Sequence, residues 1–429
     1  MKKKAIVIGS GAGGAVAARE LADTFEVLLL EAGKNFEPSV FDGSKVEWIR
    51  RSGLLIDPRM MKVSVPQMQV YKSEDMILCC AKAMGGTVNF SAGNALRYDK
   101  NLRELGIDLN QEFEELYSEI EVSTEHENRW SKGDKKLYQA FEKLGLQPQK
   151  TPKMIQFSKC RNCGQCILGC PYHAKWTVGD VLKEAQERGV KIWDKCQVQS
   201  LFIEENIVKQ VVVKHRGRRK LLEADLIILA AGGFGTPKIL ERSGIVCKDS
   251  LYVDPMLCVA TRYENAKQYK SLPMPFVTQQ EHFMISPYFD WFSFFFHKDW
   301  RFSADHILSL MIKLKDEEKG NVNKKGKVSK CITLQDGKYF HEGVEMCQEI
   351  FSEIGIDKRK LFLGTANAGH PGGTMPLTKE TSKSLHIKEL PLNLYLADST
   401  LFPKSMGNPP IFTIMALAKK VAKVCKKDI

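Results

Sequence analysis

Four closely spaced cysteines form the most specific chemical pattern in the chain. They lie within the stretch CRNCGQCILGCP and are Cys160, Cys163, Cys166 and Cys170. The spacing C-x2-C-x2-C-x3-C-P is the one with which ferredoxins bind a 4Fe-4S cluster through thiolates. A structural zinc site usually joins two separated C-x2-C pairs, and a run of eleven residues leaves too little chain for that. The pattern therefore predicts an iron–sulfur cluster rather than zinc or inert thiols.

The fourth ligand of this cluster has two kinds of candidate. In two-cluster ferredoxins the last cysteine of such a run binds the other cluster, but this chain has only one run. Either Cys170 completes the cluster, or a remote cysteine takes its place. The remote candidates are Cys79, Cys80 and Cys196.

A glycine-rich turn near the N-terminus predicts a dinucleotide site. In KAIVIGSGAGGAVAARELA an apolar strand passes through Gly9, Gly11 and Gly14 into a helix of small residues. These glycines permit the tight turn, the close approach of a pyrophosphate and the packing of helix on strand. The next strand, EVLLLEAG, ends in Glu31, whose carboxylate can accept hydrogen bonds from an adenosine ribose. The ligand predicted from this pattern is FAD or NAD.

The C-terminal stretch LNLYLADSTLFPKSMGNPPIFTIMALAKKVAKV supplies a second part of this site. It predicts a strand, then Asp398, then a loop and an amphipathic helix that begins near Asn408 and Pro409. Asparagine caps free backbone N–H groups at a helix start, and proline suits the first turn. The positive end of such a helix can stabilise negative charge on a bound flavin.

Five blocks of the sequence resemble, in order along the chain, the glucose-methanol-choline (GMC) flavoprotein oxidoreductases. They are the N-terminal glycine fingerprint, AMGGTVNFSAGNALR (83–97), ADLIILAAGGFGTPKILERSGI (224–245), HPGGTMPL (370–377) and NLYLADSTLFPKSMGNPPIFTIMALA (393–418). The form GGTVNFSA is most similar to the long-chain alcohol oxidase branch. The resemblance implies that the dinucleotide is FAD.

The fold expected from this resemblance is α/β with a second domain of the α+β class. A Rossmann-like FAD-binding domain is assembled from residues 1–100, 175–248 and 385–429. A substrate-binding domain with an antiparallel sheet covers the reactive face of the flavin, and we assign it residues 249–384. Residues 101–174 are expected to form an inserted helical segment that carries the iron–sulfur loop.

The resemblance also implies the roles of individual site residues. His370 aligns with the catalytic histidine of the family, and Asn408 aligns with its His or Asn partner. Oxidation of an alcohol needs a base that removes the hydroxyl proton while hydride leaves for flavin N5, and histidine suits this task near neutral pH. The residues expected to bind the cofactor are Gly9, Gly11, Gly14, Glu31, Gly85, Gly86, Asn89, Asp398, Asn408 and Pro409.

FAD and a 4Fe-4S cluster together predict a link between hydride chemistry and a one-electron partner. A flavin accepts two electrons together, whereas a cluster carries one at a time. The expected function is therefore an alcohol dehydrogenase whose electrons pass through the cluster to an acceptor such as ferredoxin. Two alternatives remain: a reductase of C=C or C=O bonds that runs the other way, and a non-redox or electron-transfer flavoprotein.

The substrate is the least defined feature of the sequence. The stretch PYFDWFSFFFHKDWRF (287–302) holds nine aromatic residues, and alternating aromatics in a core strand are the leading interpretation. Such density also suits an apolar alcohol or carbonyl substrate, or a peripheral membrane contact. A sugar or polyol substrate stays open, as does the oligomeric state.

Composition excludes several other classes of protein. The net charge of +12 comes from dispersed lysines without interleaved aromatics, which argues against a nucleic-acid site. Apolar runs long enough to span a bilayer are missing, and the apolar stretch after the N-terminus is too short for a signal peptide. The expected location is the cytoplasm, where the cysteines outside the run would stay reduced.

Overall fold

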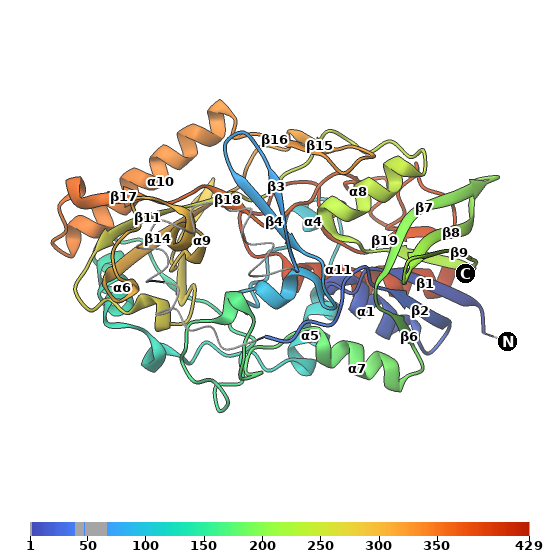
Figure 1. Cartoon of the computed structure of the whole chain (residues 1–429), viewed down its shortest axis with the longest axis horizontal. Helices are drawn as coiled ribbons and strands as arrows, with labels where there is room; N and C mark the ends of the chain where they lie inside the picture. Colours follow the sequence, from blue (N-terminus) through green and yellow to red (C-terminus); the bar gives the residue numbers. More distant parts are fainter. Residues whose placement is uncertain (1, 39–46, 48–66, 429) are drawn as a thin grey trace.

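The computed structural model describes residues 2–38, 47 and 67–428, and two sheets organise this part of the chain. A five-stranded sheet lies toward the end of the molecule that holds both termini, and a larger sheet lies toward the opposite end (Figure 1). Residues 39–46 and 48–66 of the predicted FAD-binding segment lie outside the described residues.

The five-stranded sheet is parallel and is assembled from distant segments of the chain. Its strands, in spatial order, are β19 (Leu394–Leu396), β10 (Leu226–Leu229), β1 (Lys4–Ile8), β2 (Glu26–Leu30) and β6 (Lys191–Trp193). Their short apolar runs are largely buried, as expected for a parallel sheet covered on its faces. The helices that accompany this sheet are α1 (Ala12–Leu21), α7 (Gly179–Glu187), α8 (Gly232–Arg242) and α11 (Ile411–Asp428).

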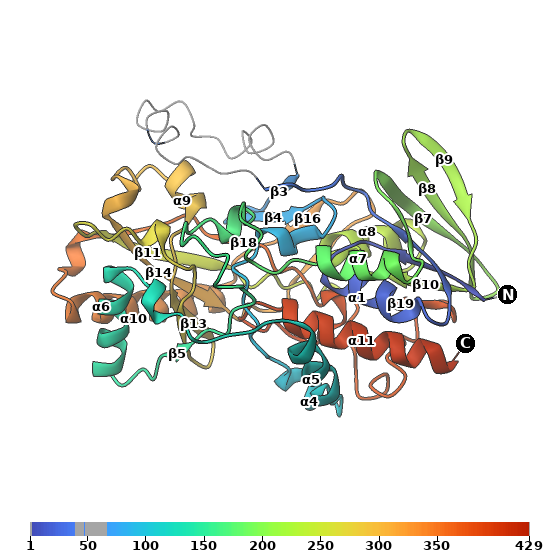
Figure 2. The ribbon, with the colours of Figure 1, turned by 90° about the horizontal axis from the view of Figure 1, so that it is seen from below.

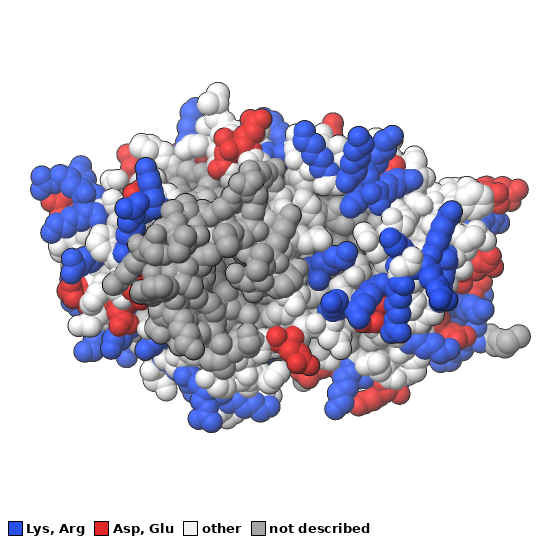
Figure 3. Space-filling view, viewed as in Figure 1, with Lys and Arg blue, Asp and Glu red and all other residues white. Residues whose placement is uncertain are grey.

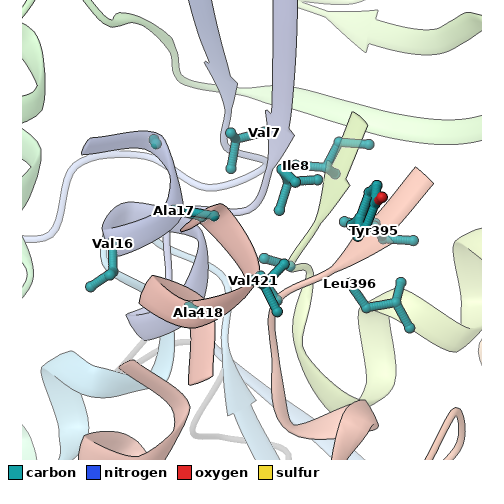
Figure 4. Close-up of a cluster of buried hydrophobic side chains, with 14 of the residues drawn as sticks. Val7, Ile8, Val16, Ala17, Tyr395, Leu396, Ala418 and Val421 are labelled. Carbon is teal, nitrogen blue, oxygen red and sulfur yellow. The ribbon is translucent and has the colours of Figure 1, made fainter. Parts of the chain in front are cut away.

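The two ends of the chain pack directly on one another within this unit. Helix α1 contacts both α7 and α11, and the layering is visible in Figure 2. Figure 4 shows Val16 and Ala17 of α1 beside Ala418 and Val421 of α11. The predicted strand–turn–helix start and the C-terminal helix are therefore confirmed as parts of one core.

Glycines allow the backbone of α1 to approach neighbouring strands closely. Gly9 has φ +102°, and a Cβ there would lie 2.3 Å from the carbonyl oxygen of Ala230. A Cβ on Gly14 would lie 2.0 Å from the carbonyl oxygen of Gly9. Gly13 is equally constrained, because its Cβ would lie 1.7 Å from the carbonyl oxygen of Ala397.

A small antiparallel sheet extends from this unit at the end of the molecule that holds both termini (Figures 1 and 2). Its strands are β7 (Cys196–Glu204), β8 (Ile207–His215) and β9 (Arg218–Leu222). In Figure 3, Lys and Arg side chains spread over the described surface with Asp and Glu among them, which agrees with the dispersed charge expected from the sequence.

The larger sheet has nine strands and is antiparallel except where β4 and β18 pair. In spatial order it runs through β3 (Met68–Lys72), β4 (Ile77–Ala81), β18 (Asn367–Ala368), β11 (Met256–Arg262), β14 (Ile307–Leu314), β13 (Phe283–Pro287), β12 (Phe276–Gln279) and β5 (Gln149–Lys150). Strand β17 (Leu361–Leu363) pairs with β11. The predicted combination of a Rossmann-like domain and a second, mainly antiparallel sheet is confirmed, whereas the domain boundaries stay predictions.

Hydrophobic clusters cover both faces of the large sheet. Alternate residues of β14 join different clusters: Leu310 and Ile312 face the side of α6 and α10, and Met311 faces the side of α9. The strand is consequently buried along its whole length. Bounds of the covering helices are Lys132–Lys143 for α6, Leu334–Glu353 for α10 and Trp291–Phe296 for α9.

Within the aromatic stretch over residues 287–302, residues 291–296 form the helix α9 where a strand was expected. Strand β13 ends at Pro287, and the Asp290 carboxylate then accepts a hydrogen bond from the Phe292 backbone N–H at 2.9 Å and caps α9. The expected core role is confirmed, because Phe294 and Trp300 are completely buried. The strand prediction was wrong because it considered only the spacing of the aromatic residues and took no account of Asp290, which can cap a helix at this point.

The remaining described elements are short connections or hairpins. They are α4 (Lys100–Arg103), α5 (Asn110–Glu119), β15 (Gly320–Val322), β16 (Val328–Lys330) and the 3-10 turns at Gly86–Phe90, Glu127–Arg129, Cys166–Leu168, Gln268–Lys270, Ala304–His306, Lys358–Lys360 and Ser399–Leu401. None of the helices within the described ranges combines the length and hydropathy needed to cross a membrane.

The contact between α1 and β19 can be tested with Gly13→Ala. The new methyl group would overlap the backbone of Ala397, so we expect the free energy of unfolding to fall by about 1–3 kcal/mol or folding to fail. Gly337→Ala is the matched control, because it lies in an exposed turn of α10 with nothing within 4 Å of its Cβ. Urea unfolding followed by circular dichroism would contradict the close packing if both variants matched the wild type.

Candidate functional site

One cavity of about 320 Å³ lies where the glycine turn, α8 and the C-terminal segment meet. Several residues that the sequence singled out line it. They are Gly9, Gly11, Glu31, Gly86, His370 and Asp398. Pro410 and Ile411 line the cavity at the start of α11. The other predicted cofactor residues are not among those that line it: Gly14, Gly85, Asn89, Asn408 and Pro409.

The N-terminus of α1 opens onto the cavity. A Cβ on Gly11 would meet no atom within 4 Å, and no side chain of the described residues caps the free backbone N–H groups of this helix. A helix start with unpartnered amides and no side chain in front of it fits a pyrophosphate. The geometry thus fits the dinucleotide predicted from the glycine spacing.

Glu31 joins three loops around the cavity. Its carboxylate is 6% exposed and accepts hydrogen bonds from the Ser10 N–H at 3.0 Å, the Ser10 hydroxyl at 2.6 Å and the Gly33 N–H at 2.6 Å. The Ser10 hydroxyl in turn accepts the Gly85 N–H at 2.9 Å. Glu31 therefore holds the turn in shape and still reaches the cavity wall, where a ribose hydroxyl can find it.

Asn89 shapes the turn that precedes it instead of facing the cavity. Gly85 and Gly86 have φ of +90° and +56°, backbone conformations that residues other than glycine adopt only with strain. The Asn89 amide donates to the carbonyl oxygen of Met84 at 2.8 Å and closes this turn. Asn89 and Gly85 thus support the cavity through the backbone.

Asp398 links the C-terminal segment to the start of α8. Its carboxylate accepts the Gly232 N–H at 2.8 Å and the hydroxyl groups of Thr236 and Thr400 at 2.6 Å. Burial raises the pKa of Asp398, while these hydrogen bonds lower it. The residue therefore fixes the wall that a flavin would contact.

His370 presents its imidazole to the cavity. The side chain is 28% exposed and follows β18, at the junction of the two sheets. Burial and the nearby Lys313 ammonium hold the pKa of His370 well below its usual range. The imidazole is consequently neutral at pH 7, the state that a general base requires.

Asn408 is buried, and its side chain makes different contacts from those expected. Its amide donates to the Gln279 side-chain oxygen at 2.8 Å and to the Met406 carbonyl oxygen at 3.3 Å, and α11 begins three residues later at Ile411. Asn408 therefore does not cap the backbone of α11. It ties the last loop to β12 of the large sheet.

The four cysteines of the run line a small common pocket. Cys166 and Cys170 are buried, and Cys160 and Cys163 are half-buried. Backbone N–H groups point at two of the sulfur atoms, because Asn162 donates to Cys160 Sγ at 3.4 Å and Ala174 donates to Cys170 Sγ at 3.3 Å. Within the described residues, no group of three or more His, Cys, Asp or Glu side chains is arranged to hold a metal ion.

The remote cysteines considered as a fourth ligand lie elsewhere. Cys80 and Cys196 line the large cavity, and the Cys79 thiol donates to the carbonyl oxygen of Ala368 at 3.6 Å. Among the candidates, Cys170 is the one that shares a pocket with the rest of the run.

Two buried lysines lie next to this pocket. The Lys153 ammonium contacts the side-chain oxygen of Asn94 and the carbonyl oxygen of Pro273, the latter at 2.6 Å. Lys153 is 0% exposed and Lys175 is 3% exposed. Burial lowers the pKa of Lys153 to about 7 and that of Lys175 to about 8. The sequence interpretation missed both, since lysine in a sequence normally indicates surface.

Lys175 connects the cysteine pocket with the wall of the large cavity. Its ammonium donates to the carbonyl oxygens of Cys166 at 3.0 Å and Ser91 at 3.0 Å, and to that of Val88 at 3.3 Å. Ser91 and Val88 line the large cavity, and Cys166 lines the cysteine pocket. The Lys175 side chain therefore lies between the large cavity and the cysteine pocket.

Comparison with solved structures supports the architecture. The fold is similar to that of pyridoxine 4-oxidase from Mesorbium loti, with a TM-score of 0.72 and 16% sequence identity over 98% of this chain and 99% of that one. At this identity the likeness concerns the fold alone.

Curated relatives cover the chain to different extents. An uncharacterized protein of Methanocaldococcus jannaschii is 26% identical over 97% of this chain and 98% of its own length. A long-chain-alcohol oxidase of Arabidopsis thaliana is 26% identical over 56% of this chain, which spans only 34% of that protein. An uncharacterized GMC-type oxidoreductase of Mycobacterium tuberculosis is 27% identical over 56% of this chain and 39% of its own length.

A family profile covers more than half of the sequence. The profile described as GMC oxidoreductase matches residues 4–253, a range that includes the glycine turn, Glu31 and the start of α8. These are the elements that shape the large cavity. The chain therefore belongs to the GMC oxidoreductase family.

Proposed function

We propose that the protein is an FAD-dependent dehydrogenase that oxidises the CH–OH group of a small-molecule alcohol and delivers electrons to a one-electron carrier. FAD is the cofactor expected for a GMC oxidoreductase, and when bound it would supply the acceptor for the substrate hydride. The residues that would hold it are Gly11 at the helix start, Glu31 and Asp398.

The observation that carries this proposal is a neutral imidazole on the wall of the cavity. His370 has a lowered pKa and is partly accessible, so it can take a proton from a substrate hydroxyl. Proton removal from the hydroxyl is the task that alcohol oxidation requires of the protein. Asn408, predicted as the second polar group of the site, contacts Gln279 and does not line the cavity, so its proposed role is to position the last loop.

The proposed role of His370 can be tested with His370→Ala. Loss of the general base should slow the anaerobic bleaching of the flavin in a single turnover by about 10²- to 10⁴-fold. The assay uses stopped-flow absorbance with a panel of 1-hexanol, 1-octanol, 1-dodecanol and glycerol. His173→Ala is the control, because His173 is exposed and lies away from the cavity. Unchanged bleaching in His370→Ala at full FAD content would remove His370 from the mechanism.

The cysteine pocket is the proposed site of a 4Fe-4S cluster. Its donor set is four thiols from one short run, the number of cysteine ligands that such a cluster takes. The backbone N–H groups directed at sulfur match the hydrogen bonds that iron–sulfur sites make. The cluster would supply a one-electron exit for electrons taken from the substrate.

The two buried lysines support an anionic occupant of this pocket. Buried charges are normally paired, because an isolated ion loses its hydration. The contacts of Lys153 and Lys175 in the described part of the chain are all with neutral oxygens. A cluster held by four thiolates would place negative charge beside both ammonium groups.

Metal content and a serine variant test the cluster and its role. Anaerobically purified protein should contain about four irons and matching acid-labile sulfide per chain. Cys163→Ser should lose the cluster and turn over slowly with ferredoxin, while an alcohol still bleaches its flavin at the wild-type rate. Exposed Cys331→Ser is the matched control. Stoichiometric zinc without sulfide, or full ferredoxin-linked turnover in a folded Cys163→Ser protein, would contradict the proposal.

The buried lysines give a separate electrostatic test. Lys175→Met removes a positive charge beside the pocket and should make the reduction potential of the cluster more negative. A shift of about 59 mV corresponds to a tenfold change in the reduction equilibrium. Lys159→Met, an exposed lysine next to the same run, is the control and should shift the potential less. A redox titration followed by EPR measures the cluster potential of each variant. A potential in Lys175→Met equal to that of the wild type would argue against the charge pairing.

A further inference from the structure

One buried carboxylate lies between the two segments that carry the proposed catalytic residues. Asp254 precedes β11 and is 1% exposed. Its Oδ2 lies 3.8 Å from His370 Nδ1. Its Oδ1 accepts the Ser405 hydroxyl at 2.5 Å and the Gly407 N–H at 3.1 Å, in the loop that leads into Asn408.

The two facing atoms of Asp254 and His370 are both buried and make no hydrogen bond within the described part of the chain, although the Lys313 ammonium also lies 3.8 Å from Asp254 Oδ2. Buried polar atoms are rarely left unpaired, so such a pair indicates an interaction that the site is built to make. A charge-assisted hydrogen bond between nitrogen and a carboxylate spans about 2.7–2.9 Å. Shortening the 3.8 Å separation by about 1 Å would satisfy both atoms at once.

The surroundings hold Asp254 in an unfavourable backbone conformation. Its φ is +49°, in the left-handed region that non-glycine residues adopt with strain. Its N–H donates to Asp316 Oδ1 at 2.8 Å, and its carbonyl oxygen accepts the Lys313 ammonium at 2.7 Å. Asp316 is in turn paired with Lys330 at 2.8 Å. Strain that is held from several sides in this way is typical of functional positions.

We propose that Asp254 is the positioning residue of His370. Its carboxylate accepts a hydrogen bond from the Nδ1–H group of the imidazole. This keeps the proton on Nδ1 and leaves Nε2 unprotonated as the base for the substrate hydroxyl. Through Ser405 and Gly407, the same carboxylate fixes the loop that carries Asn408. This inference rests on the proposed role of His370 and adds the residue that selects its tautomer.

Charges around Asp254 set the pH range in which this arrangement operates. Burial and the neighbouring Asp316 raise the pKa of Asp254 to about 6, against the opposing effect of Lys313. At pH 7 the carboxylate is therefore ionised while His370 is neutral. Below about pH 6 the carboxylate takes up a proton and no longer accepts from Nδ1. The titratable groups that face this network are Lys313, Asp316, Lys330, Tyr252 and Glu318.

The tautomer of His370 can be read directly in the wild-type holoenzyme. Long-range ¹⁵N NMR of histidine-labelled protein distinguishes a protonated Nδ1 from a protonated Nε2, and the spectrum of His370→Gln identifies the signals. We expect Nδ1 to be protonated in the wild type at pH 7. A wild-type imidazole with the proton on Nε2 would overturn the proposal, and this measurement depends on neither a substrate nor a second variant.

Asp254→Asn tests the consequence for the reaction. It should keep FAD and slow the single-turnover bleaching of the flavin by about 10²- to 10⁴-fold, with an unchanged dependence on alcohol concentration. The probe is 1-octanol, or whichever panel alcohol bleaches the wild-type flavin fastest. The acidic limb near pH 6 in the wild type should move to lower pH, because the group that titrates there is gone.

A matched control and a comparison separate the possible failures. Asp290→Asn replaces another buried carboxylate whose pKa is raised to about 6, but one that caps α9 away from the cavity, and it should react like the wild type. If flavin bleaching is slow in His370→Ala but has the wild-type rate and pH profile in Asp254→Asn, only the inference about Asp254 is overturned. A fast His370→Ala overturns the proposed base itself.

Discussion

Close contact between backbones from distant parts of the chain is the constraint on which the site depends. Where α1 leaves β1, Cβ atoms on Gly9, Gly13 and Gly14 would overlap carbonyl oxygens of neighbouring segments. Without side chains at these positions, β1, β10 and β19 can lie side by side and bring their carboxyl ends to one edge. Gly11 differs, because its missing Cβ leaves space toward the cavity and not toward protein. The glycines needed for close packing therefore differ from Gly11, the glycine proposed to face the cofactor.

Charge burial is the second constraint, and it is met in two different ways. Around Asp254 the buried charges of both signs come from the chain itself, since Lys313 and Lys330 accompany Asp254 and Asp316. Next to the cysteine pocket, Lys153 and Lys175 have only neutral oxygen partners among the described residues. The first network is electrically balanced without a ligand. The second has no counter-charge among these residues, and burial lowers the pKa of both lysines. The proposed cluster would supply that counter-charge.

Local patterns made much of the fold and part of the site predictable. The glycine spacing and the apolar runs are properties of neighbouring residues, and together with the family resemblance they predicted the parallel sheet correctly. Glu31 and Asp398 line the large cavity, and their roles toward a cofactor stay predictions. Contacts between residues far apart in the sequence could not be predicted from such local patterns. Asn408 meets Gln279 across 129 positions of sequence, so its expected capping role could not be checked from its neighbours. Asp254 carries no local sign of its contact with His370, because a polar residue before a strand normally indicates a turn.

The position of Lys175 has a consequence for electron uptake at both proposed centres. Its ammonium contacts backbone oxygens of both the cavity wall and the cysteine loop, so an altered charge on either side changes its electrostatic energy. The ammonium would favour added negative charge on either side, because its low exposure leaves little water to screen the attraction. Removing this lysine would therefore make electron uptake less favourable at both proposed centres, which is the sign expected for the reduction potential of Lys175→Met.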